Sequence, residues 1–265
     1  MNLPAIEEVS QIVRQAAREE LLPRFTRVER GLKADGSVIT EADLAMQQRL
    51  QTQLSQRWPR YRFMGEEMAA SKQEAMLADT HDGLWCLDPL DGTSNFAAGI
   101  PFFSVSLSLI QEGEVVVGVV YDPMLDECFC AVRGQGARLN GEPLRPPAPP
   151  PLQQCTALID FKRLAPELAQ RLVTERPYSS QRSFGSVALD WCWIAAGRCH
   201  IYLHGKQSLW DYSAGSLILQ EAGGHAITLE GETVMHPSLA PRSAVAASDA
   251  NLFRAWGEWL EIDMP

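Results

Sequence analysis

The sequence predicts a mixed α and β fold built from two parts, and three observations lead to that prediction. Apolar residues recur at helical spacing over residues 6–17, which indicates an amphipathic helix near the start. Residues 104–110 alternate between apolar and polar side chains, as a half-buried strand does. From residue 157 to residue 222, helical patterns alternate with short apolar runs, which is typical of an α/β layer.

Residues 145–151 divide the chain. They hold five prolines in seven positions, which neither continue a helix nor fit a central strand. Such a segment favours extended polyproline geometry and acts as a stiff connector. We therefore predict an N-terminal part over residues 1–145, which carries most of the acidic motifs, and a C-terminal part over residues 152–265.

The N-terminal part begins with two predicted helices. We expect Pro23 to end the first, and Thr40 to cap the second with Asp43 three positions later in a box-like arrangement. A short strand over residues 61–64 ends at Gly65. Further strands, the last three in an antiparallel meander, are predicted over residues 84–87, 104–110, 115–121 and 128–132.

The C-terminal part is expected to mix both types of element. Gly197 and Gly223 follow two of its apolar helical runs, and glycine commonly ends helices. Strands are predicted over residues 157–159 and 200–203, and helices over residues 166–173, 187–196 and 210–222.

Composition excludes several classes of protein. Hydrophobic residues make up 46% and charged residues 21%, which is ordinary for a globular chain. The net charge of −10 argues against nucleic acid or an anionic membrane as partner, because those partners usually meet a basic face. No apolar run approaches the roughly 20 residues of a membrane span, and the first residues lack the basic-then-apolar order of a signal peptide.

The six cysteines indicate a reducing compartment. They form no CxxC pair and show no zinc-type spacing with histidine, and most lie among apolar neighbours. We expect reduced and mostly buried thiols, and therefore a cytoplasmic protein.

Three acidic clusters carry the candidate chemistry: Gly65-Glu66-Glu67, residues 88–95 and Trp210-Asp211. In the second, a strand delivers Asp88, and a tight turn brings Asp91 close enough to face the same cation. Gly92 allows a ligand to approach the backbone, and the residues after it are expected to start a helix whose free N–H groups favour an anion. Carboxylates beside a phosphate cradle suit Mg²⁺, and no His/Cys cluster competes for a softer metal.

Each cluster also has an ordinary structural interpretation. Residues 91–95 are common turn formers, the Glu66-Glu67 pair is typical of a solvated surface, and Asp211 is a frequent type of helix cap. The occurrence of all three in one chain favours the functional interpretation, although spacing alone does not bring them together.

These motifs resemble those of the inositol monophosphatase family. The resemblance rests on Gly65-Glu66-Glu67, on Asp88-Pro89-Leu90-Asp91-Gly92-Thr93-Ser94-Asn95-Phe96 and on Trp210-Asp211-Tyr212-Ser213-Ala214-Gly215. The segment from Lys33 to Asp43 resembles the upstream motif of the family, and Glu221-Ala222-Gly223-Gly224 the continuation of its last signature. The similarity covers most of the chain with the motifs in the family's order.

The resemblance implies a layered αβαβα sandwich, a homodimer and Mg²⁺-dependent, lithium-sensitive hydrolysis of small phosphate monoesters. By position it implies that Glu66, Asp88 and the Leu90 carbonyl hold a first Mg²⁺. It assigns the second ion to Asp88, Asp91 and Asp211. Glu66 would also help a weaker third ion, largely through water.

The resemblance also assigns catalytic roles. Gly92 and Thr93 would donate backbone N–H groups to the phosphate, and Thr93 paired with Asp43 would orient and activate the attacking water. This agrees with the needs of phosphoryl transfer, which are mainly positioning and charge stabilisation. Asp43 has an alternative role as a first-turn residue favoured by the helix dipole.

The substrate side departs from the family pattern. Family members that act on inositol carry a glutamate that contacts ring hydroxyls seven positions before the aspartate of the last motif, and this chain has His204 there. The family's substrate-side Gly-Thr-Ala stretch appears as Gly185-Ser186-Val187. Inositol 1-phosphate is the first candidate substrate. Fructose 1,6-bisphosphate, adenosine 3′,5′-bisphosphate and histidinol phosphate are the alternatives.

Two further functions remain open at this point. Some relatives act through protein partners in the transcription machinery, so the chain could be a regulatory binding protein. Alternatively, the carboxylates could use Mg²⁺ only to stabilise the fold, which predicts thermal stabilisation by the metal without turnover. The complete set of Glu66, Asp88, Asp91, Thr93 and Asp211 favours an enzyme.

Overall fold

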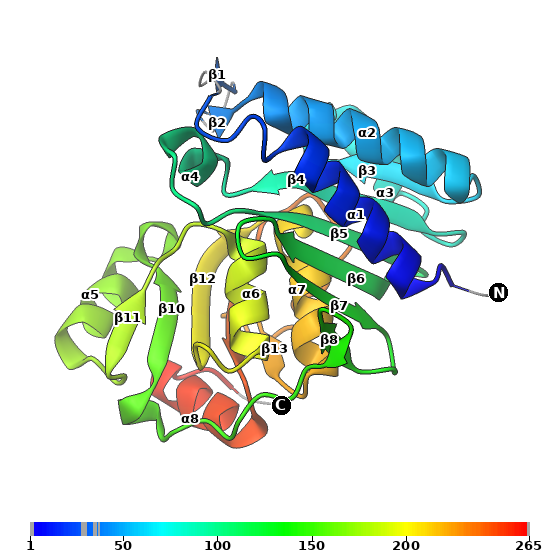
Figure 1. Cartoon of the computed structure of the whole chain (residues 1–265). Coiled ribbons are helices and arrows are strands. Elements are labelled where there is room, and N and C mark those ends of the chain that lie inside the picture. Colours follow the sequence, from blue (N-terminus) through cyan, green and yellow to red (C-terminus); the bar gives the residue numbers. More distant parts are fainter. Residues whose placement is uncertain (1–2, 28–30, 34–35, 37, 264–265) are drawn as a thin grey trace.

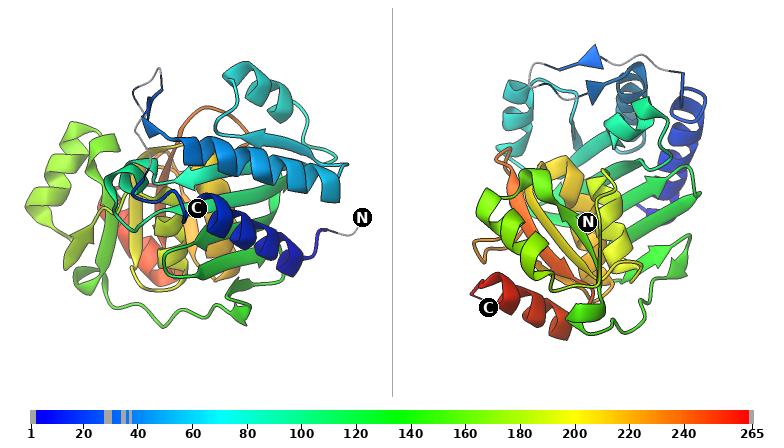
Figure 2. Two further views of the ribbon diagram at one scale, coloured as in Figure 1. Left: turned by 45° about the horizontal axis from the view of Figure 1, so that its top comes forward. Right: turned by 90° about the vertical axis from the view of Figure 1, so that its left-hand side faces the viewer.

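The computed structural model describes residues 3–27, 31–33, 36 and 38–263. Its elements form five layers in the order helix, sheet, helix, sheet, helix (Figure 1). The two other directions of view in Figure 2 show the same two sheets with the helices between and outside them. The predicted mixed α and β fold, with its layered αβαβα arrangement, is confirmed.

The first outer layer consists of α1 (Ile6–Glu20) and α2 (Glu41–Arg57). Helix α1 ends three residues before Pro23, and Thr40 and Asp43 form the expected capping box of α2. The apolar faces of both helices pack on the first sheet in one cluster of buried side chains, which includes Val13, Leu50 and Trp85.

The first sheet has seven strands and is antiparallel except for its first pair. In spatial order they are β3 (Arg62–Gly65), β4 (Leu84–Asp91), β5 (Ser104–Gln111), β6 (Glu114–Asp122), β7 (Glu127–Val132), β8 (Ala137–Leu139) and β9 (Glu142–Pro143). Two short helices follow β3 and β4, namely α3 (Ala70–Leu77) and α4 (Thr93–Ala98). The small β1 (Gly31–Leu32) and β2 (Val38–Ile39) form a separate antiparallel pair.

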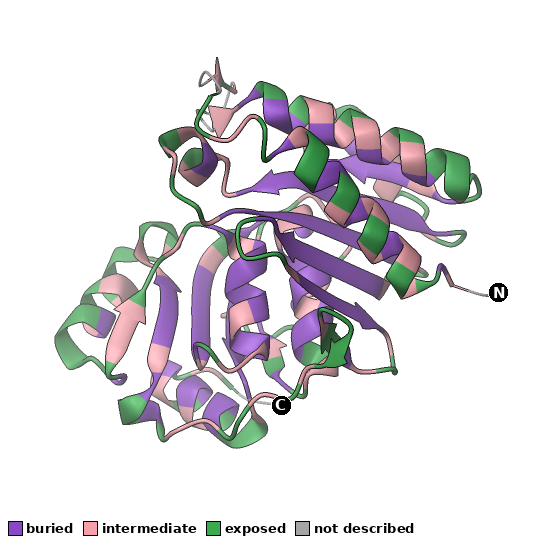
Figure 3. Ribbon diagram, viewed as in Figure 1, coloured by how far each residue is buried: buried purple, intermediate pink, exposed green. Residues whose placement is uncertain are grey.

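The middle layer consists of α6 (Val187–Ala195) and α7 (Leu209–Glu221), and its core contains residues of both sheets. Gly118 of β6 lets α7 approach closely, because a Cβ at that position would lie 2.9 Å from the Ala214 carbonyl oxygen. The helices therefore rest directly on the first sheet, and the strands between the layers are buried on both faces (Figure 3).

The second sheet has five strands, in the order β11 (Ser180–Arg182), β10 (Thr156–Asp160), β12 (Ile201–Gln207), β14 (Arg242–Ala247) and β13 (His225–Ile227). The first three are mutually parallel, and β14 is antiparallel to both of its neighbours. Helices α5 (Pro166–Glu175) and α8 (Ala250–Leu260) form the last layer. Short 3₁₀ turns over Leu152–Gln154 (η1) and Phe161–Arg163 (η2) flank β10.

Two strand predictions need correction. Strand β5 was expected to be half-buried, but it is buried on both faces, because its alternating serines bond to the middle helices. The strand predicted to stop at Asp88 continues to Asp91, with a shift of register between those two residues. The bulge keeps both acids within the strand.

The cysteine and membrane expectations rest on separate findings. All six cysteines are buried and unpaired, as expected of thiols used for packing. Among the described residues no helix combines the length and the apolar character that a membrane span requires.

Residues 144–151 form neither helix nor strand. The division into two parts remains a prediction, since the middle core joins residues from both sides of the connector.

Candidate metal and phosphate site

The end of the first sheet brings Glu66 beside the Asp88 strand. Strand β3 is parallel to β4 and pairs Gly65 with Leu87, and the Glu66 N–H donates to the Leu87 carbonyl at 3.0 Å. Asp88 is the next residue of β4 and is only 2% exposed. Its Oδ1 accepts the Leu90 N–H at 3.0 Å, which orients the turn that leads to Asp91. The two motifs therefore meet where their strands end.

Asp211 reaches the same place from the middle layer. It lies in the first turn of α7, and its Oδ2 accepts the Ser208 N–H at 2.9 Å. Ser106 pairs with Asp88 in the sheet, and its hydroxyl donates to the Trp210 carbonyl at 2.9 Å. The Ser106 hydrogen bond thus connects the start of α7 to the strand pair that carries Asp88. The interpretation of Asp211 as the helix cap is wrong in detail, because Ser208 is the N-cap of α7 and Asp211 is the third helical residue, whose carboxylate completes the capping box.

Burial and neighbouring negative charges raise the pKa values of Asp88 and Asp211. Burial raises the pKa of Asp88 well above its ordinary value, and the charges of Glu66, Asp91 and Asp211 raise it further. Burial, Asp91 and Glu66 act in the same direction on the pKa of Asp211. Buried carboxylates that repel each other are stabilised by protons or by a cation between them.

Asp91 is held by the N-terminus of α6. Its carboxylate accepts the Ser186 hydroxyl at 2.5 Å, the Ala188 N–H at 2.7 Å and the Val187 N–H at 3.2 Å. Burial still raises the pKa of Asp91 to about 6, although these three hydrogen bonds oppose the shift. Gly185-Ser186, which were predicted on the substrate side, thus also support a metal-ligand candidate.

Glu66 and Glu67 share the ammonium group of Lys33. The Lys33 Nζ lies 2.7 Å from Glu66 Oε1 and 2.6 Å from Glu67 Oε1. The Glu67 side chain is 4% exposed, so the interpretation of a solvated pair is wrong for it. Burial raises its pKa to about 7 despite the nearby lysine. Ala34, Asp35 and Ser37 of the upstream motif lie outside the described residues.

The donor set fits a hard divalent ion after a change of partners. Among the described residues, no group of three or more Asp, Glu, His or Cys is arranged so that it could hold a metal as it stands. Glu66 bonds to Lys33 and Asp91 bonds to α6, so metal binding requires these carboxylates to exchange partners. Carboxylate and carbonyl oxygens are ligands that Mg²⁺ prefers, and the charge of the ion would relieve the repulsion among the carboxylates.

Thr93 lies next to Asp43, as the motifs imply. The Thr93 hydroxyl is 3.0 Å from Asp43 Oδ1 and 2.9 Å from the Leu90 carbonyl oxygen. Because the hydroxyl has a single proton, it donates to one of these two acceptors at a time. The other oxygen of Asp43 accepts from the Thr40 N–H at 2.8 Å and the Thr40 hydroxyl at 2.6 Å. Burial raises the pKa of Asp43 against these hydrogen bonds. The alternative capping role therefore coexists with the contact to Thr93.

Gly92 provides the close approach expected of a phosphate cradle. Its φ is +91°, in the left-handed region, and an added Cβ would lie 3.1 Å from the Phe102 carbonyl and 3.2 Å from the Gly185 carbonyl. The Asn95 amide holds the same two loops by donating to the carbonyls of Phe102 and Phe184 at 2.8 and 2.7 Å. Helix α4 begins directly after Gly92, and the first N–H groups of a helix have no partner within it.

His204 differs from its prediction. It was expected to face a substrate hydroxyl or lie on the surface at a strand end, but it is buried against Asp160, with the Nε2 and Oδ2 atoms 3.2 Å apart. Sequence reasoning also missed the role of Ser106, whose hydroxyl donates to the Trp210 carbonyl. No local signal reveals the contacts of His204 and Ser106, because each joins elements that are far apart in the chain.

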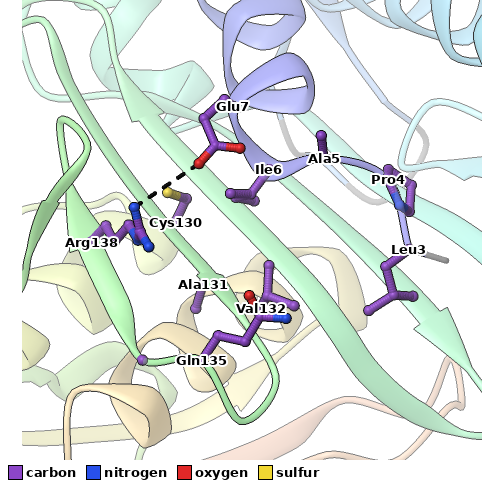
Figure 4. Close-up of a pocket in the computed structure, with 11 residues that line it drawn as sticks. Leu3, Pro4, Ala5, Ile6, Glu7, Cys130, Ala131, Val132, Gln135 and Arg138 are labelled. Atoms are coloured by element: carbon purple, nitrogen blue, oxygen red, sulfur yellow. Dashed lines mark ion pairs between the residues drawn. The ribbon is translucent and has the colours of Figure 1, made fainter.

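The pocket in Figure 4 lies in another part of the molecule. It has a volume of about 520 Å³ and is formed by residues 3–7 against β7 and β8, with Glu7 and Arg138 paired across it at 4.0 Å. None of the predicted site residues lines it. The acidic cluster at the strand ends is therefore the candidate site on chemical grounds.

Comparisons with known proteins give matches over most of the chain. The sequence matches the model of the "Inositol monophosphatase family" over residues 2–259. It is 34% identical to "Inositol monophosphatase 1" of Solanum lycopersicum, with 87% of this chain and 85% of the relative covered. It is 36% identical to "Nus factor SuhB" of Pasteurella multocida, covering 76% and 75%. The solved suhB structure from Bartonella henselae superimposes with a TM-score of 0.84 at 29% identity, covering 96% and 97%.

Proposed function

The chain belongs to the inositol monophosphatase family, a family of phosphatases, and from that premise we propose that it hydrolyses a small polyol or sugar phosphate with Mg²⁺. Inositol 1-phosphate is the first candidate substrate. The proposal is supported by the charges of Glu66, Asp91 and Asp211, which are close enough to raise the pKa of Asp88 in the strand that leads to Gly92. Four acidic side chains that repel one another lower the stability of the folded state unless a cation neutralises them.

In this mechanism, Glu66, Asp88 and the Leu90 carbonyl would hold one ion, and Asp88, Asp91 and Asp211 would hold the second. Glu66 would contribute to a weaker third. The chemistry supplied by Mg²⁺ at this place would be activation of water at neutral pH and neutralisation of charge on the phosphate. The backbone N–H groups of Gly92 and Thr93 bind the phosphate oxygens, and Gly185-Ser186 line the substrate side.

Thr93 and Asp43 orient the water that attacks phosphorus. The attacking water passes a proton toward Asp43 while its oxygen forms the new P–O bond, the ester P–O bond breaks, and the departing alkoxide takes a proton from solvent water. Asp43 suits the role of proton acceptor, because burial moves its pKa upward from the range of an exposed aspartate. No covalent phospho-enzyme is required.

A panel of esters tests the function. Phosphate release is measured with Mg²⁺ for inositol 1-phosphate, fructose 1,6-bisphosphate, adenosine 3′,5′-bisphosphate, histidinol phosphate and phenyl phosphate. We expect turnover of at least one hydroxyl-bearing monoester, abolished by chelation of the metal. The absence of turnover on every ester would contradict the proposal.

Magnesium is expected to stabilise the protein more at pH 8 than at pH 5. The raised pKa of Asp88, Asp91 and Asp211 means that the folded state holds protons more tightly than the unfolded state. The metal-free protein therefore loses stability as the pH rises from about 4, the unfolded value, through about 6 for Asp91. At pH 8 the ion replaces those protons.

Thermal unfolding with and without Mg²⁺ measures this difference. At a concentration 100 times the dissociation constant, binding adds about 2.7 kcal/mol, and each kcal/mol raises Tm by about 2–4 °C. A shift of similar size at pH 5 and pH 8 would contradict the proposed ligand set.

A regulatory role is the second candidate, favoured by the similarity to proteins named Nus factor SuhB. An Asp91→Asn variant separates the two. A binding function would survive the substitution, whereas the phosphatase would lose its activity. Stabilisation by Mg²⁺ without turnover of any ester would instead favour a purely structural metal site.

Three further properties are proposed with the function. Family membership supports a homodimer and lithium sensitivity. The six buried free thiols support a cytoplasmic location.

A further inference from the structure

The proposed mechanism leaves unused a hydrogen-bonded contact between a histidine and an aspartate on two strands of the second sheet. Asp160 ends β10 and lies opposite His204 of β12 in the parallel register. The His204 Nε2 is 3.2 Å from Asp160 Oδ2, and the two side chains are 6% and 14% exposed.

The hydrogen bonds of His204 are all made within the protein. Its Nδ1 accepts the Lys206 N–H at 3.3 Å, so the ring proton lies on Nε2 and is donated to Asp160. The ring therefore has no polar atom left for a ligand. Its effect on a substrate must pass through Asp160.

Asp160 has acceptor capacity to spare. Its Oδ1 accepts the Lys162 N–H at 3.2 Å and its Oδ2 accepts from His204, whereas a carboxylate offers about four acceptor positions. Burial would raise the pKa of Asp160, but the hydrogen bond from His204, with the charge and the backbone N–H of Lys162, holds it below its ordinary value. Asp160 is thus an ionised and partly exposed acceptor.

The topology places Asp160 at the edge where the site lies. Strands β10, β11 and β12 are parallel, and α6 and α7 start at the carboxyl ends of β11 and β12. Ligands of α/β sheets bind at such an edge. Asp91 is bonded to the first turn of α6, and Asp211 lies in the first turn of α7.

Two neighbours support this placement. Arg163, in the turn that follows Asp160, is close enough to lower the pKa of Asp211 in part. The buried Asp190 of α6 feels the charges of both Asp91 and Asp160, and its Oδ1 finds no hydrogen-bond partner among the described residues. Asp190 therefore lies near both the metal-ligand candidate Asp91 and Asp160.

The turn after Asp160 is also rigidly supported. A Cβ at Gly205 would lie 1.8 Å from the Arg163 carbonyl oxygen, so the backbone of η2 rests directly on β12 beside His204. This contact fixes Asp160 relative to both strands.

We propose that Asp160, positioned by His204, accepts a hydrogen bond from a hydroxyl group on the alcohol half of the substrate. Asp160 would then be a specificity-determining residue that selects polyol and sugar phosphates over esters without hydroxyls. The inference rests on the proposed phosphatase function and adds the residue that recognises the alcohol.

Asp160→Asn tests the inference. The variant and the wild type are compared on the best hydroxyl-bearing ester of the panel and on phenyl phosphate, which has no hydroxyl. We expect KM for the hydroxyl-bearing ester to rise about 10- to 100-fold, the range for a hydrogen bond to a charged group, and KM for phenyl phosphate to change less than about twofold. An equal change for both esters, or none, would overturn the inference.

Variants of His204 provide an independent test if Asp160→Asn does not fold. His204→Gln keeps an N–H near Asp160, whereas His204→Leu removes it. We expect the leucine variant to lose discrimination between the two esters and the glutamine variant to retain most of it. Equal discrimination in both variants would overturn the positioning role. The wild type is measured first, and its inactivity on both esters would refute the phosphatase function itself. The variants are then compared only with an active wild type, so the two failures are distinguishable.

Discussion

Asp88→Asn is expected to lower kcat by more than about a hundredfold and to leave the metal-free protein at least as stable at pH 8. Asp88 is the one aspartate assigned to both of the two main ions, so its loss weakens both. The same substitution removes a buried negative charge that Glu66, Asp91 and Asp211 repel. The substitution is therefore expected to lower kcat while the stability of the metal-free protein stays the same or rises.

Asp122→Asn is the matched control. Asp122 is likewise buried with a raised pKa, and its Oδ1 accepts the Met124 and Leu125 N–H groups where β6 ends. Steady-state kinetics and thermal unfolding are measured for both variants. If Asp88→Asn retains a tenth or more of the wild-type kcat, or if Asp122→Asn loses as much, the special role of Asp88 is refuted.

Thr93→Val is expected to lower kcat by about a hundredfold with little change in KM, because general-base steps contribute at least that much. Valine keeps the shape of threonine and removes the hydroxyl between Asp43 and the Leu90 carbonyl. Substrate binding relies on other groups, so the effect belongs to the chemical step.

Thr93→Ser restores the hydroxyl and serves as the control. We expect it to keep kcat within about tenfold of the wild type, well above the valine variant. Kinetics under saturating Mg²⁺ separate kcat from KM. Equal activity of the valine and serine variants would show that the hydroxyl does not act in catalysis.

Local sequence signals predicted the elements that depend on local chemistry. Thr40 and Asp43 form the predicted capping box because the cap involves residues only three positions apart. The strand over 84–87 was predicted from its apolar run, yet its end was misplaced, because the bulge between Asp88 and Asp91 depends on pairing with β5. A strand boundary that depends on pairing with a neighbouring strand cannot be predicted from the sequence of the strand alone.

Polar residues inside the layers account for the other errors. The serines of β5 looked like a solvent face, but Ser104 lies 3.3 Å from Ser186 of the α6 start, and Ser108 lies 2.7 Å from Ser213 of α7. A buried polar face is stable when each group has a partner, and these partners come from another layer. His204 was misjudged for the same reason, since its partner Asp160 lies on a different strand.

The most direct test of the account is anomalous diffraction from crystals soaked with Mn²⁺ in place of Mg²⁺. We predict at least two peaks, one within coordination distance of Glu66 and Asp88 and one among Asp88, Asp91 and Asp211, with the Lys33 ammonium displaced from Glu66. Well-ordered crystals at saturating Mn²⁺ that show no peak among these side chains would contradict the central claim that they form a cation site.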